Sequence, residues 1–319
     1  MGLLPRDGRP SLGQLLALPG CGAFPPREAG RIGRVGRDDG RREVCFLSSR
    51  ARFVVLERAL RQVGRELGLS TVDVVYVDAM PSTSLLSRVG GCAGRWSGRL
   101  GGPGRRLAAR SVRTIYPGLV DLVRRTREAL TTGAKRDPRE NPGTGAKTPG
   151  QMPRGGTKVF YYCYGSSHTS VVAAAIHTGR LDLERVPTIA ELTSLRHFDR
   201  VRSAELGTVF PAGLGPDGER VYVVGLGPGR KIIHQTILSF LELQQVPPRE
   251  YLFADALSRA NWVVRAGGLA SRRLGLVALG RPLAALGIQM VYPRLASLVA
   301  ETRAEVGRRL GLTGVSGGG

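Results

Sequence analysis

The residues best suited to chemistry lie together in one short segment, CYGSSHTS at positions 163–170. It contains a thiol, an imidazole and several hydroxyl groups, and it leads into an apolar stretch at 169–177 that predicts a helix. Backbone N–H groups in a glycine-containing turn before a helix N-terminus form a site for anions. We therefore expect a small anion such as phosphate to bind here. The expected binding residues are Gly165, Ser166, Ser167, His168, Thr169 and Ser170.

Cys163 opens this turn and could act as a nucleophile. The spacing resembles the phosphate loop of small cysteine phosphatases, in which a cysteine opens the loop and an arginine followed by a serine closes it. Thr169 stands where that arginine would be, so the bidentate clamp for a phosphoryl group is missing. Three alternatives stay open: cysteine catalysis, binding of an anion or nucleotide, and a tight turn with a structural role. The candidate catalytic residues are Cys163, His168 and Asp255.

The histidines do not predict a metal site. His168 and His177 are nine residues apart, about two and a half turns of a helix, which is too far to share one ion. Cys163 and His168 would need a third ligand, such as Asp255. We expect His177 to lie near the negative end of the helix dipole instead. We predict no metal, and the sequence leaves the cofactor unknown.

Two further residues are expected near the turn. Asp255 follows an apolar segment at 251–254, and it could hold a ribose hydroxyl, a magnesium ion or a proton, or it could cap the next turn. Arg281 follows another apolar segment at 276–279 and is the expected ligand-binding arginine. Because sites in parallel sheets form at the carboxyl ends of the strands, these residues and the turn predict one pocket.

Strands and helices alternate in the second half of the chain. Apolar runs predict strands at 159–163, 221–224, 251–254 and 276–279. Helices are expected at 169–177, 188–195 and 231–244, from Ser258 to Gly267-Gly268, and from Pro293 onward, and residues 213–218 are expected to form a turn. Thr188 and Glu191 have the spacing of a capping box. The alternation predicts an α/β fold with a mainly parallel sheet covered on both faces.

The first part of the chain repeats the second. Asp78 pairs with Asp255 (255 − 78 = 177), and Tyr116 pairs with Tyr292 (292 − 116 = 176) after a gap of one residue. The first copy begins at the equivalent of Gly179, so it lacks the opening strand, the turn and the helix. A repeat of this length indicates two domains of similar structure.

We therefore predict two Rossmann-like three-layer domains with mainly parallel sheets, the first of which lacks its opening strand and helix. The expected boundaries are 1–130 for the truncated first copy, 131–157 for a flexible Gly- and Pro-rich linker, 158–310 for the complete second copy and 311–319 for a disordered tail. Either the first copy has lost its site and kept its scaffold, or the true start lies upstream of Met1.

Three motifs mark the second copy: YYCYGSSHTSVVAAAIHTG, DALSRANWVVRAGGLASRRLGL and GRPLAALG. Together with a final helix that begins with Tyr-Pro, they resemble the domain-of-unknown-function 3189 family, a group of small proteins from Firmicutes bacteria. The resemblance covers nearly all of residues 158–308, and the first copy resembles the same family from its second element onward. The family's Gly-Arg-Pro triplet stands here as Gly280-Arg281-Pro282 and is degraded in the first copy to Pro103-Gly104-Arg105. The resemblance implies a tandem duplication within this family but no activity.

Composition sets the protein class and its expected surroundings. A chain of 319 residues, 42% of them hydrophobic, can bury the cores of two globular domains. The sequence predicts no membrane span and no signal peptide, so we expect a cytoplasmic location. The cysteines at positions 21, 45, 92 and 163 have no disulfide or zinc spacing and are expected to be reduced.

The net charge of +22 would be typical of a protein that binds a polyanion. However, lysine occurs only at positions 135, 147, 158 and 231, so arginine carries nearly all of the positive charge. With 45 glycines, this bias indicates GC-rich coding more than a nucleic-acid partner. Nucleic-acid binding is therefore an alternative that is not favoured. The expected partners are a small anionic ligand and, within the chain, the other copy.

Two function classes remain. The first is a phosphate- or nucleotide-binding α/β protein, with the turn, Asp255 and Arg281 around one pocket. The second is a non-catalytic scaffold or regulatory protein, in which the two copies pack as a fused pseudo-dimer. The duplication favours the second class, because one copy has dispensed with the turn.

Overall fold

The computed structural model describes Ser11 and residues 30–37, 43–47, 52–69, 103–131, 156–273 and 276–311. The chain divides into two compact units. The first contains residues 1–29 and 75–153, and the second contains residues 30–74 and 154–319.

Apart from Ser11, the structure describes one helix of the first unit, α4 (Pro103–Thr131). On its surface the carboxylate of Asp121 pairs with Arg124 at 2.5 Å and also with Arg125, at the spacings where helical side chains meet. Pro117 lies inside this helix rather than at its start.

A four-stranded sheet forms the centre of the second unit, in the order β4 (Val209–Leu214), β5 (Arg220–Gly225), β3 (Lys158–Cys163), β6 (Tyr251–Asp255). Strand β3 runs parallel to both β5 and β6, but β4 pairs antiparallel with β5. The sheet is thus mixed, and the prediction of a mainly parallel sheet is corrected. The fold is mixed α/β, as expected.

The antiparallel strand β4 was not predicted, because its sequence VFPAGL contains both Pro211 and Gly213. Proline cannot donate to a ladder, and such residues are tolerated mainly in edge strands and at bulges. Strand β4 is an edge strand, and its pairing with β5 shifts between Pro211 and Gly213. A turn was predicted at 213–218, but its first two residues, Gly213 and Leu214, belong to the strand.

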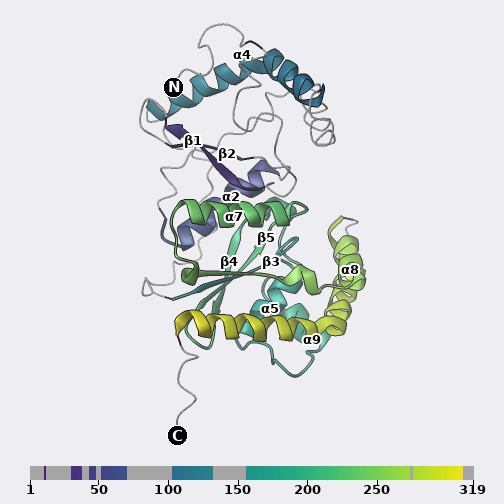
Figure 1. The fold of residues 1–319 in the computed structure, drawn as a ribbon. Helices are drawn as coiled ribbons and strands as arrows, with labels where there is room; N and C mark the ends of the chain where they lie inside the picture. The colour runs from purple at the N-terminus through teal and green to yellow at the C-terminus, as the bar shows by residue number, and fades with distance from the viewer. Residues whose placement is uncertain are drawn as a thin grey trace. The chain divides into compact units, whose positions relative to one another are not determined.

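The two faces of β3 bury different helices, because successive side chains of a strand point to opposite faces. Val159 and Tyr161 join a core formed with α5 (Thr169–His177) and α9 (Val277–Leu310). Figure 1 shows these helices on one side of the sheet and α7 (Arg230–Leu243) on the other.

The side chains on the α7 face are mostly aromatic. Phe160 stacks between Tyr222 of β5 and Phe253 of β6, with ring centroids 5.1 and 4.8 Å apart. Tyr162 stacks on His234 of α7 at 4.8 Å. Both faces of β3 are thus covered, which explains why its sequence is a continuous apolar run.

The last helix is much longer than predicted. α9 begins at Val277, so the predicted strand at 276–279 and the predicted helix start near Pro293 are wrong. Pro282 and Pro293 both lie inside the helix. An interior proline removes a hydrogen bond and costs about 3 kcal/mol, so it is normally evidence for a helix start. Here a buried face that includes Ala285, Ile288, Val291 and Leu295 packs against the core and offsets that cost.

α8 (Trp262–Arg273) packs closely along the first part of α9. Gly267 was predicted to lie at the end of this helix, but it lies inside α8. A Cβ atom at Gly267 would lie 2.4 Å from the backbone N of Ala284, and one at Gly280 would lie 2.3 Å from the backbone N of Ser271. The glycines therefore allow two helix backbones to touch.

Short helices and their caps connect these elements. Asp255 caps η6 (Ala256–Arg259), and Asn261 accepts a hydrogen bond from the backbone N of Val264 at 2.9 Å at the start of α8. The helix that was expected to begin at Ser258 therefore begins at Trp262. The remaining short elements are η4 (Ser203–Glu205) and η5 (Pro248–Glu250).

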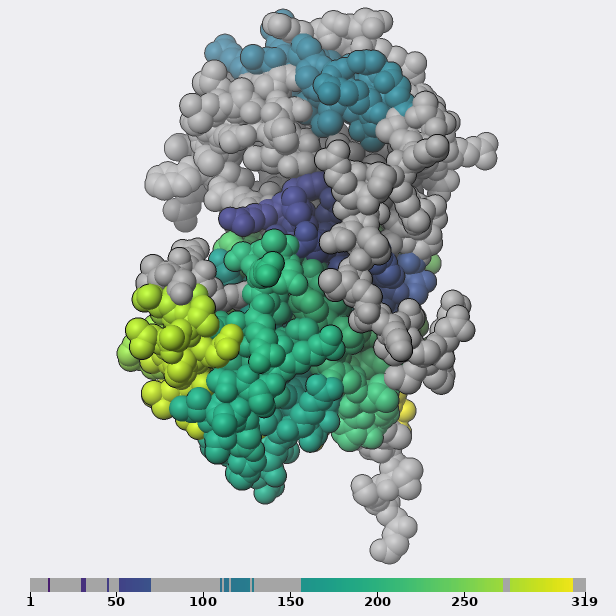
Figure 2. Space-filling model, turned by 180° about the vertical axis from the view of Figure 1, so that it is seen from behind, coloured from purple at the N-terminus to yellow at the C-terminus, as the bar shows by residue number. Residues whose placement is uncertain are grey.

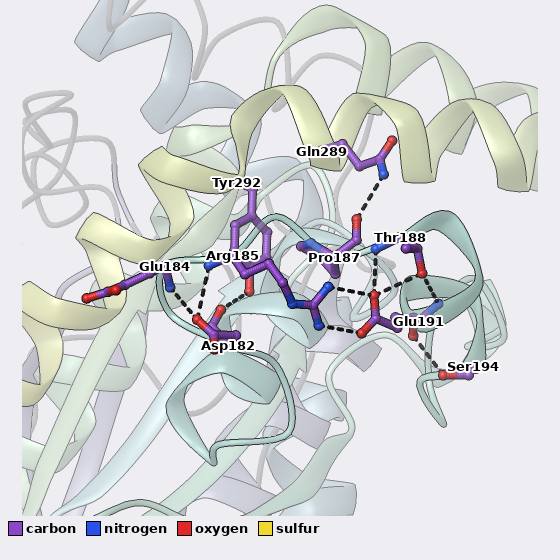
Figure 3. Close-up of polar contacts among 9 residues, drawn as sticks. All are labelled: Asp182, Glu184, Arg185, Pro187, Thr188, Glu191, Ser194, Gln289 and Tyr292. Atoms are coloured by element: carbon purple, nitrogen blue, oxygen red, sulfur yellow. Dashed lines mark hydrogen bonds and ion pairs between the residues drawn. The ribbon is translucent and has the colours of Figure 1, made fainter.

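The predicted capping box is confirmed at α6 (Ile189–Ser194). The side chain of Thr188 accepts from the backbone N of Glu191, and the Glu191 carboxylate accepts from the backbone N of Thr188 (Figure 3). Arg185 pairs with Glu191 at 2.6 Å. Gln289 of α9 donates to the carbonyl of Pro187, at 2.8 Å, and so fastens this segment to the core.

The duplication is visible in three elements of the first copy: β1 (Ile32–Arg37), β2 (Glu43–Leu47) and α2 (Phe53–Glu66). Adding 177 to the bounds of β1 and α2 gives the bounds of β4 and α7. Adding it to β2 gives residues 220–224 of β5. The pairing of β1 with β2 also shifts between Arg34 and Gly36, the equivalents of Pro211 and Gly213.

α9 is the one helix of the described residues that is long and apolar enough to cross a membrane, and half of its most apolar stretch is buried inside the fold. Its exposed side includes Leu279, Leu283, Leu286 and Met290. Figure 2 shows the second unit from behind, with its teal and green residues forming one continuous surface beside the yellow-green residues of α8 and the start of α9.

Candidate functional site

The turn between β3 and α5 folds tightly over the sulfur of Cys163. The Sγ atom accepts a hydrogen bond from the backbone N of Ser166 at 3.2 Å and another from the hydroxyl of Ser170 at 3.0 Å. The hydroxyl of Ser167 donates to the carbonyl of Gly165 at 2.9 Å. Ser166 has a positive φ of 51°, which few serines adopt. These local contacts therefore hold the turn in a shape that includes a strained backbone at Ser166.

Two hydroxyl groups in this turn are buried without a partner among the described residues. They are the Oγ of Ser166 and the Oγ1 of Thr169, and each residue is only 1% exposed. A buried hydroxyl without a hydrogen bond costs about 1–3 kcal/mol. No side chain caps the N-terminus of α5, where His168 occupies the cap position. Unused donors thus gather where a helix dipole favours negative charge.

The loop after β5 forms one wall of the turn. The backbone N atoms of Leu226 and Gly227 donate to the carbonyls of Cys163 and Tyr164, at 3.0 and 2.8 Å. A Cβ atom at Gly225 would lie 2.8 Å from the backbone N of Ser166. The GLGPG sequence at 225–229, which resembles a dinucleotide loop only in part, thus supports the turn of the neighbouring strand.

A second polar group lies on the other side of His168. Its Nε2 is 3.2 Å from Asp199 Oδ1, while the hydroxyl of Ser271 donates to Asp199 Oδ2 at 2.5 Å. Arg281 Nε lies 3.6 Å from the same carboxylate. The Asp199 side chain is fully buried. Asp199 therefore joins two of the predicted site residues, His168 and Arg281, and fastens the turn to α8 and α9.

The charge state of Asp199 follows from these contacts. Burial alone would raise the pKa of this carboxyl, but the hydrogen bonds from His168 and Ser271 and the charge of Arg281 outweigh it, so the net pKa is lowered. Asp199 also has a positive φ of 53°, a conformation in which Asp and Asn are enriched. Nothing in the local sequence HFDRV indicates this role, because every partner is distant in sequence.

Asp255 is engaged in a different set of contacts. Its Oδ1 accepts from the backbone N atoms of Leu257 and Ser258, at 3.1 and 3.3 Å. Of the roles considered for Asp255, these contacts correspond to the cap of the next turn. Its Oδ2 lies 3.4 Å from Nε of Arg230, the first residue of α7. The structure thus brings His168 and Arg281 together with the turn, and Asp255 pairs with Arg230 at the end of β6. Within the described ranges, no three His, Cys, Asp or Glu side chains are grouped as metal ligands.

His177 belongs to a buried triad at the opposite end of α5. Its Nδ1 lies 2.7 Å from the hydroxyl of Tyr161, and its Nε2 lies 2.6 Å from Glu219 Oε1. Burial would raise the pKa of Glu219, but the hydrogen bonds from His177 and from nearby backbone outweigh it, so the net pKa is lowered. Arg303 donates to the carbonyls of Ile176 and His177, both at 2.9 Å, so it is this arginine that satisfies the end of the helix.

A cleft runs along the side of α5, away from the turn. It is lined by apolar residues of α5, β4 and β5 and by the polar residues Thr178, Arg180, Arg196 and His197. Burial, together with the charge of Arg196, lowers the pKa of His197. The cleft does not include the residues of the turn, so this recess and the site predicted from sequence are separate.

The second copy is therefore a mixed α/β unit with a polar, tightly closed turn at the carboxyl end of a central strand. The chain belongs to the family described as Protein of unknown function (DUF3189), whose model matches residues 1–128 and 158–304. The match falls in two blocks, consistent with the two copies. No curated protein and no solved structure matches this chain.

Proposed function

We propose that this protein binds a small anion, of the size and charge of a phosphate or phosphoryl group, at the turn between β3 and α5. The observation that carries the proposal is the pair of buried, unpartnered hydroxyls on Ser166 and Thr169 at the uncapped start of α5. A bound oxyanion would accept from both hydroxyls and from the backbone N–H groups of the first helical turn.

The charges around the turn are consistent with a binding role. Asp199 neutralises Arg281, and no other arginine approaches the turn among the contacts described above. The main attraction for an anion would therefore come from the hydroxyls and the helix N-terminus. Such a site suits binding better than hydrolysis, because it lacks the bidentate arginine that would stabilise a transferring phosphoryl group.

A thermal-shift measurement on the full chain tests the proposal. Inorganic phosphate at about 100 times its Kd should raise the Tm by roughly 5–10 °C, since saturating ligand stabilises the folded state by mass action. Chloride at equal ionic strength is the reference. No shift with phosphate beyond that seen with chloride would overturn the proposal.

Two valine variants make the test specific. Thr169→Val removes an unpaired hydroxyl, so the protein without phosphate should be as stable as the parent or more stable by about 1 kcal/mol, while the phosphate shift is lost. Thr302→Val is the control: Thr302 is also buried, but its hydroxyl donates to the carbonyl of Leu298 at 2.6 Å. It should lower the stability and keep the phosphate shift. An unchanged phosphate shift in Thr169→Val would contradict the assignment.

The alternative of a scaffold or regulatory protein made of paired copies is also favoured by an observation. Residues 30–69 of the first copy belong to the same compact unit as the second copy. The contacts between residues 30–69 and the second copy come in pairs that are related by the offset of 177 residues.

A further inference from the structure

Two glycines, one in each copy, make the same contact with the other copy. A Cβ atom at Gly207 would lie 2.5 Å from the carbonyl oxygen of Val55, and a Cβ atom at Gly30 would lie 2.6 Å from the carbonyl oxygen of Ile232. Both differences (207 − 30 and 232 − 55) equal 177. Both glycines also have a positive φ, +87° and +92°. The backbone before β4 thus lies on α2 just as the backbone before β1 lies on α7.

Two hydrogen bonds repeat the same pattern. The backbone N of Ile32 donates to the hydroxyl of Ser239 at 3.0 Å, and the backbone N of Val209 donates to Gln62 Oε1 at 2.5 Å. Again both differences (209 − 32 and 239 − 62) equal 177. An interface in which both partners use the same surface, so that each contact occurs twice with the partners swapped, is two-fold and isologous.

The element contacts follow the same rule. α2 packs against α7, β1 contacts α7, and β4 contacts α2 (Figure 1). On the first-copy side of this interface, the guanidinium of Arg58 donates to the carbonyl of Leu206 at 2.9 Å and also to the carbonyl of Ala204. Its equivalent in the second copy is Gln235 (235 − 58 = 177). Arg58 of α2 thus anchors the segment that carries Gly207.

We propose that residues 30–69 act as a built-in second subunit. They occupy the surface formed by α7 and the start of β4, in a pseudo-two-fold arrangement, and so fix the segment that carries Gly207. This segment leads directly to the candidate site. The backbone N of Gly207 donates to the carbonyl of Gly225 at 2.7 Å, and Gly225 lies against Ser166 in the turn. The copy without a turn thereby positions the turn of the other copy.

Hydrogen exchange, measured by mass spectrometry on the full chain without phosphate, tests this proposal. Gly30→Ala and Arg58→Ala change the first copy only, and the readout is taken in the second copy. Exchange of the amides of residues 203–209 and of α7 should become about tenfold faster or more, with a smaller increase at residues 165–170. The reciprocal variant, Gly207→Ala, should increase exchange in α2.

Arg65→Ala is the matched control, because Arg65 is an exposed residue of the same helix. It should leave exchange in the second copy unchanged. Unchanged exchange at 203–209 and in α7 for both first-copy variants would overturn the proposal, whether or not α2 itself had lost protection. Parallel loss in α2 and α7 would support it. Because no phosphate is present, this result is independent of the anion-binding test.

Discussion

His168 and Asp199 are 31 residues apart in the sequence, yet the imidazole Nε2 lies 3.2 Å from the carboxylate Oδ1. The contact joins the turn after β3 to the segment after α6, and Ser271 extends it to α8. Because these partners stabilise the ionised carboxylate, its contribution to stability depends on its remaining ionised.

We expect Asp199→Asn to lower the free energy of unfolding at pH 7 by about 3 kcal/mol, since it leaves Arg281 and the buried cluster without their anion. Asn tolerates the positive φ at this position, so the backbone should be unaffected. Urea unfolding of both proteins measures the difference.

The pH dependence of that difference follows from the lowered pKa of Asp199. The contribution is complete above the ordinary value of 3.8 and is lost as the pH falls through the lower, folded-state value. The two proteins should therefore become more similar in stability below that value. A difference that stayed constant down to acid pH would show that the carboxylate charge is not responsible.

The triad at the far end of α5 gives a second prediction. Glu219 accepts from His177 through Oε1 and from the backbone N of Asp217 through Oε2, at 2.6 and 2.9 Å. Glu219→Gln would place an NH2 group against one of these partners, so we expect a loss of about 1–3 kcal/mol. Glu184→Gln, an exposed change on the same domain, should stay within about 0.5 kcal/mol of the parent in thermal or urea unfolding. Equal effects of the two substitutions would count against a structural triad.

Two glycine-to-alanine changes, both inside helices, should have opposite effects. Gly267→Ala would place a Cβ atom 2.4 Å from the backbone N of Ala284, so α8 and α9 must separate, and we expect a loss of about 1–3 kcal/mol. Gly118→Ala in α4 meets nothing within 4 Å, and it should stabilise that helix by up to about 1 kcal/mol. Circular dichroism followed during thermal unfolding measures both. A neutral Gly267→Ala would show that the helix pair is not in tight contact.

Local sequence patterns predicted the parts of the fold that local physics decides. The apolar run of β3, the small residues of α5 and the capping box at Thr188 and Glu191 each lie within a few residues, and each was found where expected. β4 was missed because Pro211 opposes a strand, and the first half of α9 was missed because Pro293 favours a helix start. Pairing with β5 and burial against the core override these local preferences.

The candidate site divides in the same way. The turn was found from its composition, since glycine, hydroxyls and a thiol are adjacent in sequence. Asp199 and Glu219 were not, because their roles arise from partners that only the folded chain brings near. Arg281 was expected at the end of a strand, but it reaches Asp199 from within α9 instead.

The hydrogen-bond acceptors of Gln62 and Ser239 show what fusing two copies changes. In a symmetric pair of identical chains, one mutation alters both halves of a two-fold contact at once. Here the amide oxygen of Gln62 accepts from the backbone N of Val209. The hydroxyl of Ser239 accepts from the backbone N of Ile32. Once joined in one chain, the two halves are free to diverge separately, so that one can keep the turn while the other keeps only the paired surface.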